Sequence, residues 1–287
     1  MNKEKGSKTS QFADVWRRLK RNRAAIVGGI IVLLFVAIAL FAPLIAPYPP
    51  DEGDLTQRLS PPGREHLLGT DPLGRDLLSR VIYGARISLQ IQVVSVVIAL
   101  VIGTLLGLIG GYYGGKSDHV IMRLMDILLA FPGIFLAISI IAVLGPGLTN
   151  LMLAAGIYSV PQFARIVRGS VLALKEKEFV EAARAVGESD VDILFRYILP
   201  NSMAPIIIQT TLRMATVLLT ASGLSFLGLG VQPPMAEWGA MLSNARAYLI
   251  TAPHVATVPG LAIMLVVMGF NLFGDGLRDS LDPRLRD

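Results

Sequence analysis

The sequence predicts an all-α, polytopic membrane protein with six transmembrane helices and both termini in the cytoplasm. Of its 287 residues, 53% are hydrophobic and only 16% are charged, whereas soluble domains are nearer a quarter charged. Five long stretches contain no Asp, Glu, Lys or Arg: 24–50, 87–115, 127–164, 214–236 and 247–274. A spanning helix needs about 20 mostly apolar residues, so stretches of this kind indicate membrane spans.

The first helix is expected at 24–47, after a cytoplasmic tail at 1–23. This tail carries eight Lys and Arg residues against Glu4 and Asp14, and basic flanks stay on the cytoplasmic side. A signal peptide also begins with basic residues, but its apolar core is about 7–15 residues long. The longer run at 24–47 therefore favours an uncleaved helix.

Residues 48–86 are expected to form an extracytoplasmic loop, because they are rich in Pro, Gly and charged residues. The second helix is expected at 87–111. Gly103, Gly107 and Gly111 recur every four residues and Gly115 continues the series. Small residues at this spacing allow helices to approach closely in lipid.

Residues Gly110 to Ser117 read GGYYGGKS and match the phosphate-loop pattern G-x-x-x-x-G-K-[ST]. That pattern binds phosphate where a loop joins a strand to a helix. Here it lies between two apolar helices, so we interpret it as a short cytoplasmic turn and not as a nucleotide site.

The third helix begins near His119, with Arg123 and Asp126 spaced to pair with each other, and Pro132 is expected to kink it. Gly145-Pro146-Gly147 marks an external turn. The fourth helix is expected at about 149–172 and ends in the cytoplasm near Arg165 and Arg168.

A polar hairpin at 173–201 follows, and within it 177–201 is expected to form two short helices joined at Gly187. Ser189 or Asp190 is a suitable cap for the second helix. Spacing by three and four predicts an apolar face on each helix, composed of Phe179, Ala182, Ala183 and Val186 on the first and Val191, Leu194, Phe195 and Ile198 on the second. Pro200 is expected to begin a new element.

The fifth helix is expected at 203–221, with Gln209 and Arg213 on one face. Arg213 lies ten residues into it, about 15 Å at 1.5 Å per residue, and therefore near mid-membrane. An ionisable residue at that depth either lines a water-filled path or pairs with a neighbouring helix, and the sequence leaves both open.

Residues 222–253 form the second extracytoplasmic region, a folded or re-entrant loop with Trp238 and Tyr248 at the membrane interface. The last helix is expected at 254–273, and the polar tail returns to the cytoplasm. With this topology, most basic residues lie on the cytoplasmic side. The extracytoplasmic loop at 48–86 is the exception, because it carries five Arg residues together with six acidic residues.

No residue pattern indicates an enzyme or a metal site. The chain has no cysteine and three scattered histidines, His66, His119 and His254, which excludes disulfides and thiolate metal sites. The basic residues flank membrane segments, so the pI of about 9.6 does not indicate nucleic-acid binding.

EAARAVG at Glu181–Gly187, followed by Leu199-Pro200, resembles the cytoplasmic EAA signature of permease subunits in bacterial and archaeal ABC importers. The usual Ile position of that signature holds Tyr197. Further blocks resemble the C-type permease of the dipeptide, oligopeptide and nickel group, and the likeness covers nearly the whole chain: 66–89, Arg123–Asp126–Phe131–Pro132, 223–239 and 270–286.

The resemblance implies a type I ABC importer permease fold, with a permease core at 87–287, in a bacterial or archaeal cell membrane. It implies a homologous B-type permease as heterodimer partner, two ATPase subunits that bind ATP and Mg²⁺, and an extracytoplasmic solute-binding protein. The chain itself is expected to bind no cofactor. The residues expected to couple to the ATPase are Glu181, Ala182, Ala183, Gly187, Glu188, Asp190, Leu199 and Pro200.

Three alternatives remain at this level. The substrate is a dipeptide or oligopeptide, or else a nickel chelate or another small solute. A self-sufficient secondary transporter would suit Arg213, but the sequence shows no internal repeat. An ATP-hydrolysing enzyme would rest on GGYYGGKS alone.

Overall fold

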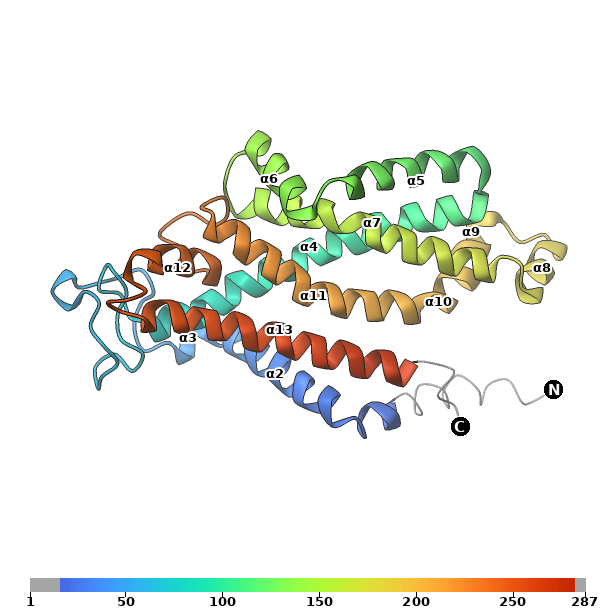
Figure 1. Cartoon of the computed structure of the whole chain (residues 1–287). Helices are drawn as coiled ribbons and strands as arrows, with labels where there is room; N and C mark the ends of the chain where they lie inside the picture. The colour runs from blue at the N-terminus through green and yellow to red at the C-terminus, as the bar shows by residue number, and fades with distance from the viewer. Residues whose placement is uncertain (1–15, 282–287) are drawn as a thin grey trace.

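Seven helices of twelve or more residues make up most of the chain in the computed structural model, which describes residues 16–281 (Figure 1). They are α2 (Arg23–Leu40), α4 (Leu77–Tyr113), α5 (Gly115–Ala130), α6 (Gly133–Leu144), α7 (Leu148–Leu174), α11 (Met203–Phe226) and α13 (His254–Leu281). The shorter ones are α3 (Ala42–Ile45), η1 (Leu55–Gln57), α8 (Glu178–Ala185), α9 (Asp190–Asp192), the π-helical turn η2 (Ile193–Ile198), α10 (Leu199–Asn201), α12 (Trp238–Ala245) and η3 (Arg246–Tyr248). Residues 16–281 contain two isolated β-bridges but no strand, so the all-α class is confirmed.

The long helices run roughly along one axis, with α4 and α7 packed against each other (Figure 1). The helix α5 packs against both of them, while α11, α13 and α2 continue the bundle on the other side. The loop that follows α3 lies at one end together with α12, and α8 lies at the opposite end. The helix α2 begins, and α13 ends, toward the end that carries α8.

Four helices are long and apolar enough to cross a membrane: α2, α4, α11 and α13. The helices α5 and α6 make a fifth span if they are counted together, although they meet at 94°. The helix α7 has 27 residues, which is long enough, but it carries Gln162, Arg165 and Arg168 and does not meet the same test. The predicted helices all exist, and the count of six spans stays a prediction.

Glycines of α4 allow it to lie close against α7, as predicted. A β-carbon added at Gly103, Gly107 or Gly111 would lie 2.5, 2.6 and 2.8 Å from the nearest atom of α7. Real β-carbons do not approach other atoms so closely, so these positions require glycine. Gly115 was expected to continue this series, but it lies in a turn with open space around it.

Replacing Gly107 by leucine is expected to destabilise the protein by at least about 1–3 kcal/mol, because the side chain would overlap Ala164 and Val167. The measurement is the apparent Tm of the detergent-purified protein by size-exclusion after heating. Gly169→Leu is the matched control, since a β-carbon at Gly169 of α7 meets nothing within 4 Å. Equal Tm values for the two variants would contradict the close packing of α4 and α7.

The second helix starts at Leu77, ten residues before the expected start at 87. Asp76 caps it, because its side chain accepts hydrogen bonds from the Ser79 amide and hydroxyl, both at 2.7 Å. Arg80, which suggested a loop, is buried and donates to the carbonyl of Pro50 at 2.6 Å. The loop before α4 is therefore shorter than predicted and contacts the start of α4.

The helices α11 and α13 also run past their predicted ends at 221 and 273. Part of the expected polar tail thus belongs to α13, whose Gly274 packs against Leu212 of α11 and whose Gly276 packs against Ala25 of α2. These contacts hold the last turns in the bundle, which explains why composition alone placed the end too early. Residues 1–15 of the predicted N-terminal tail and 282–287 lie outside the described residues.

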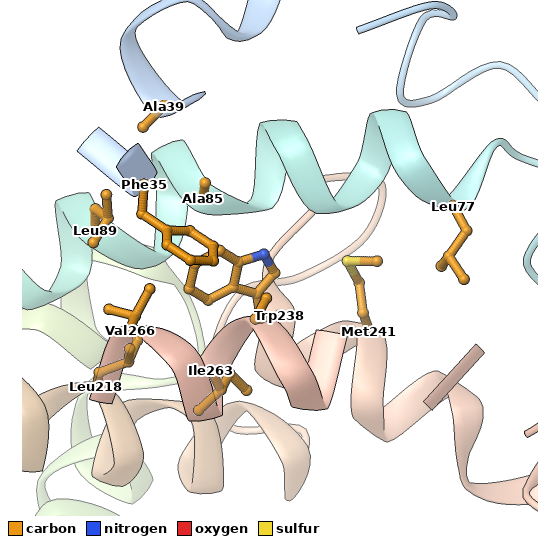
Figure 2. Close-up of a cluster of buried hydrophobic side chains, with 11 residues drawn as sticks. Phe35, Ala39, Leu77, Ala85, Leu89, Leu218, Trp238, Met241, Ile263 and Val266 are labelled. Atoms are coloured by element: carbon orange, nitrogen blue, oxygen red, sulfur yellow. The ribbon is translucent and has the colours of Figure 1, made fainter. Parts of the chain in front are cut away.

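Trp238 is the centre of a buried cluster and does not lie at the membrane interface, contrary to the prediction. Its side chain is 0% exposed, and its ring meets Phe35 of α2 edge-on with the centroids 5.7 Å apart (Figure 2). The indole N–H donates to the carbonyl of Val81 at 3.0 Å. Gly84 of α4 makes room for the ring, since a β-carbon there would lie 2.7 Å from it. For Tyr248, the interface position stays a prediction.

The kink expected at Pro132 is present as the 94° break between α5 and α6. The predicted pairing of Arg123 with Asp126 is wrong. Asp126 pairs instead with Arg165 of α7, at 2.6 Å between Oδ1 and Nη2. Spacing along one helix could not reveal this partner, because it comes from a different helix.

Candidate functional site

The polar hairpin between α7 and α11 forms the end of the molecule that carries α8 (Figure 1). The helix α8 ends at Ala185, Val186 is its C-cap, and Gly187 then turns the chain with φ +83°, a conformation that favours glycine. Ser189 caps the second helical part by accepting from the Asp192 amide at 3.2 Å, as predicted. The hairpin is thus two short helical segments joined at Gly187.

The buried side of the hairpin differs from the predicted apolar faces. The side chains that pack against α4 and α7 are Val180, Ala183, Ile193, Leu194 and Ile198. Of the residues that were expected to share these faces, Ala183, Leu194 and Ile198 are buried, whereas Phe179, Ala182, Val186, Val191 and Phe195 are exposed. The buried positions are shifted by about one residue in each helix, so three of the four residues predicted for the first face and two of the four predicted for the second are exposed.

A π-helical turn at 193–198 explains part of this shift in the second helix. Pro200 has no N–H to donate to the carbonyl of Arg196, and its ring crowds that carbonyl. A wider turn relieves this conflict. The helical backbone consequently continues through Pro200 to Asn201, so Pro200 does not begin a new element as predicted. Leu199 is partly buried on the hairpin's core, and Pro200 is exposed.

Four large apolar side chains of the hairpin are exposed, two before Gly187 and two after it in the sequence, and we call them the outer patch. Their exposed fractions are large for apolar residues at a polar end of the molecule: Phe179 38%, Val186 79%, Val191 60% and Phe195 48%. Exposed apolar patches rimmed by polar residues commonly mark contacts with another protein. Ala182 and Glu181 are exposed beside them.

Three acidic residues of the hairpin have partners in the described part of the chain. Asp190 accepts a hydrogen bond from the hydroxyl of Tyr112 of α4 at 2.7 Å. Asp192 pairs with Arg196 at 3.2 Å, and Glu188 lies 4.0 Å from the same guanidinium. Among residues 16–281, Glu181 has no hydrogen-bond or ion-pair partner and remains fully available.

The contact between Tyr112 and Asp190 ties the hairpin to α4. The guanidinium of Arg184 lies over the ring of Tyr112, 5.4 Å from its centroid, so the first hairpin helix holds the same side chain. Tyr112 therefore connects both halves of the hairpin to the longest helix of the bundle. Sequence spacing gave no signal for this contact, because 78 residues separate Tyr112 from Asp190.

Gln209 and Arg213 lie on one half-exposed face of α11. Thr216 and Thr220 extend the same face at the spacing of helical turns. In the described part of the chain, the side chains of Gln209 and Arg213 form no hydrogen bond or ion pair.

The GGYYGGKS segment forms the end of α4, a turn and the start of α5. Gly110 and Gly111 are helical, and Gly114 and Gly115 make the turn with φ of +64° and +52°. A phosphate loop needs a strand before it, and these residues follow a membrane helix. Within residues 16–281, no three His, Cys, Asp or Glu residues gather closely enough to hold a metal ion.

A buried polar cluster at the opposite end was not foreseen. Asp71 pairs with Arg75 at 2.7 Å and lies 3.4 Å from Arg80. Glu237, 1% exposed, caps α12 by accepting from the amides of Gly239 and Ala240. Burial raises the pKa of Glu237 above its ordinary value, although these amides act in the opposite direction. The cluster joins the loop before α4, α4 itself and the start of α12 at this end of the molecule.

Comparison with known families gives two matches. A family model for binding-protein-dependent transport system inner membrane components matches residues 103–287. A second model, for the N-terminal transmembrane domain of oligopeptide transport permease C, matches residues 10–62.

Curated relatives resemble the chain over most of its length. The dipeptide transport system permease protein DppC of Alkalihalophilus pseudofirmus is 50% identical over 277 residues, which are 96% of this chain and 91% of the relative. The glutathione transport system permease protein GsiD of Pectobacterium atrosepticum is 48% identical over 276 residues, 96% of this chain and 92% of the relative. The GsiD protein of Escherichia coli O157:H7 is 50% identical over 274 residues, which are 95% of this chain and 90% of the relative.

Solved structures share the fold. An inward-facing conformation of the MetNI methionine ABC transporter matches with a TM-score of 0.58 and 19% identity, over 72% of this chain and 98% of that chain. An amino acid ABC transporter with histidines matches with a TM-score of 0.54 and 15% identity, over 70% of this chain and 94% of that chain.

Proposed function

The chain belongs to the binding-protein-dependent transport system inner membrane components, the permease subunits of ABC importers, and on that premise we propose that it forms one half of the path through which short peptides enter the cell. The relatives at about 50% identity carry dipeptide and glutathione names. A dipeptide or oligopeptide is the substrate class we propose, with a nickel chelate or another small solute as the alternative.

The observation that carries this proposal is the outer patch on the hairpin. Phe179, Val186, Val191 and Phe195 expose apolar surface at an end that is otherwise polar, and this surface suits a protein partner. We propose that an ATPase subunit docks there, with Glu181, Ala182, Gly187 and Pro200 at its contact. Ala183 and Leu199 support the hairpin by packing in its core, Glu188 by its contact with Arg196, and Asp190 by its hydrogen bond with Tyr112 of α4.

Transport by this chain requires partners that supply energy and substrate. We propose a heterodimer with a homologous B-type permease, two ATPase subunits that bind ATP and Mg²⁺, and an extracytoplasmic solute-binding protein. The chain itself is a non-catalytic subunit that contacts membrane lipid, binds no cofactor and does not bind nucleic acid. It resides in the cell membrane of a bacterium or archaeon, with the basic tail at 1–23 in the cytoplasm and the segments 48–86 and 222–253 outside.

Closure of the ATPases would reach the membrane helices through the hairpin. Tyr112 holds the hairpin to α4, and the buried side chains at 193–198 pack against α4 and α7. Helices tied so firmly move with the hairpin as packed units, which suits a two-state change between outward and inward access. Gln209 and Arg213 of α11 are proposed to line this path, because an arginine without a partner in the described chain needs water at that depth.

Charging the outer patch tests ATPase docking. Burying one large apolar side chain contributes about 1.5–3 kcal/mol, so Phe179→Asp with Val186→Asp is expected to weaken binding at least about tenfold. The measurement is the yield of ATPase that co-purifies with the permease pair, together with peptide uptake.

Ile250→Asp is the control for that experiment, because Ile250 is 96% exposed in the turn before α13 at the opposite end. Unchanged co-purification of the patch variant would exclude docking at this surface. Uptake by the purified chain alone, driven by an ion gradient, would instead favour a self-sufficient secondary transporter.

A further inference from the structure

The outward surface of α5 is divided into two stripes along its length. One stripe is polar and runs through Lys116, His119, Arg123 and Asp126; the other is apolar and runs through Val120, Leu124, Ile127 and Phe131. All eight side chains are exposed, and the apolar four are between 51% and 61% exposed. The two stripes therefore face different surroundings.

The polar stripe continues far along α5 from the turn at Gly115. Asp126 lies eleven residues from Gly115, about 16 Å along α5 at 1.5 Å per residue. Its partner Arg165 lies nine residues before the end of α7, about 14 Å. The residues of α7 on both sides of Arg165 pack against Gly103 and Gly107, which belong to the charge-free stretch of α4.

The ion pair at this depth is not covered by the chain's own helices. Arg165 and Asp126 have side chains 51% and 52% exposed, and Arg123 is exposed one turn away. A charged group that faces the hydrocarbon is costly, so charges within a membrane face water or protein. The stripe is continuous with Lys116 at the cytoplasmic end, which gives water a route from the cytoplasm to the pair.

The chemistry of the pair leaves capacity for a ligand. A single contact joins Arg165 Nη2 to Asp126 Oδ1. A guanidinium has five N–H donors and a carboxylate has two oxygens, so most donors of Arg165 and one oxygen of Asp126 are unused in the described chain. Arginine suits a carboxylate, and an aspartate suits an ammonium group. A short peptide carries both groups at its ends.

We propose that the seam between α5 and α7, with Arg123, Asp126 and Arg165, lines the cytoplasmic half of the substrate path and contacts the charged ends of a transported peptide. This inference rests on the function proposed above. The seam ends at the break before α6, whose residues carry no charge. It adds a charged wall to the path, separate from Gln209 and Arg213 of α11.

The absence of cysteine from the sequence makes this testable by labelling. Single cysteines replace Arg123 or Asp126 in the polar stripe, and Leu124→Cys and Ile127→Cys are the matched controls from the adjacent apolar stripe at the same depth. Arg123→Cys breaks no ion pair of the described chain, so it still reports if Asp126→Cys fails to assemble. The complete transporter is used in inside-out vesicles, with the cysteine-free chain as the blank.

A membrane-impermeant thiosulfonate reagent reacts with hydrated thiolate, so positions 123 and 126 are expected to label at least about tenfold faster than 124 and 127. A transported dipeptide, added with the binding protein and ATP, is expected to slow labelling at 123 and 126. Equal labelling of both stripes, or a difference that the dipeptide leaves unchanged, would overturn the inference. The labelling rates without dipeptide test the hydration of the stripe and do not depend on transport. The proposed function is tested separately: it fails if the unaltered complex takes up no peptide.

Discussion

Replacing Trp238 by alanine is expected to lower the free energy of unfolding by about 3–5 kcal/mol, the range for deleting a large aromatic side chain from a packed core. Trp238 is fully buried where α2, α4, α12 and α13 meet (Figure 2). Its loss also leaves the Val81 carbonyl without the indole donor and removes the edge-on contact with Phe35. We expect a much lower yield of folded protein in the membrane and a lower apparent Tm in detergent.

Trp16→Ala is the control, because Trp16 is the only other tryptophan and is 54% exposed. Its contact with Lys20 is a surface cation–π interaction of about 0.5–1 kcal/mol. The Trp238 variant must therefore be clearly less stable than the Trp16 variant. Equal Tm values would mean that Trp238 does not hold the four helices together.

Replacing Gly187 by proline is expected to reduce uptake at least about tenfold while the permease pair still assembles. Proline holds φ near −65°, far from the +83° observed here, and it removes the amide that donates to Arg184 at 3.0 Å. A distortion of only about 1.4 kcal/mol lowers the population of the correct hairpin conformation tenfold. Uptake and ATP hydrolysis are measured on the same membranes.

Further substitutions of Gly187 separate the effect of backbone conformation on uptake from the effect of side-chain size. Nothing lies within 4 Å of a β-carbon added at Gly187, so bulk is tolerated and the positive φ is the constraint. Asparagine adopts positive φ more readily than other side chains, so Gly187→Asn is expected to keep most uptake and Gly187→Ala an intermediate level. Normal uptake by the proline variant, or equal loss in the asparagine variant, would contradict a role for this bend in coupling.

The long-range pattern of the sequence predicted the helices well, because membrane depth imposes a length on every apolar segment. Gly103, Gly107 and Gly111 also predicted close packing correctly, since the small-residue spacing has one physical use in lipid. The break at Pro132 followed from the missing amide of proline. These features depend on local chemistry or on the bilayer.

The features that sequence reasoning missed depend on partners from distant segments. Asp126 was paired with Arg123 because they share a helix, but Arg165 of α7 offers the better geometry. Leu77 became the start of α4 because the folded loop buries Arg80 and Asp76. Trp238 looked like an interface residue because its pocket is formed only when Gly84 and Phe35 come together.

In the hairpin, too, sequence spacing did not predict which side chains are buried. Regular spacing assigned Val186 and Val191 to buried faces, but both side chains point outward. The π-turn before Pro200 alters the spacing of the second helix, which a fixed 3.6-residue period does not describe. The EAA resemblance located the hairpin as a whole, while the residues on its outer patch became known only from the fold.

The early start of α4 sets a distance for substrate delivery. From Leu77 to Ile87 the helix rises about 15 Å beyond its charge-free stretch. The loop after α3 and the helix α12 both contact this extension, and together they form a protein wall at this end of the molecule. Under the proposed function, a solute delivered at this end passes this length of protein before it reaches the charge-free stretch of α4. Capture of the solute should accordingly respond to ionic strength and to charges on this wall more than to lipid composition.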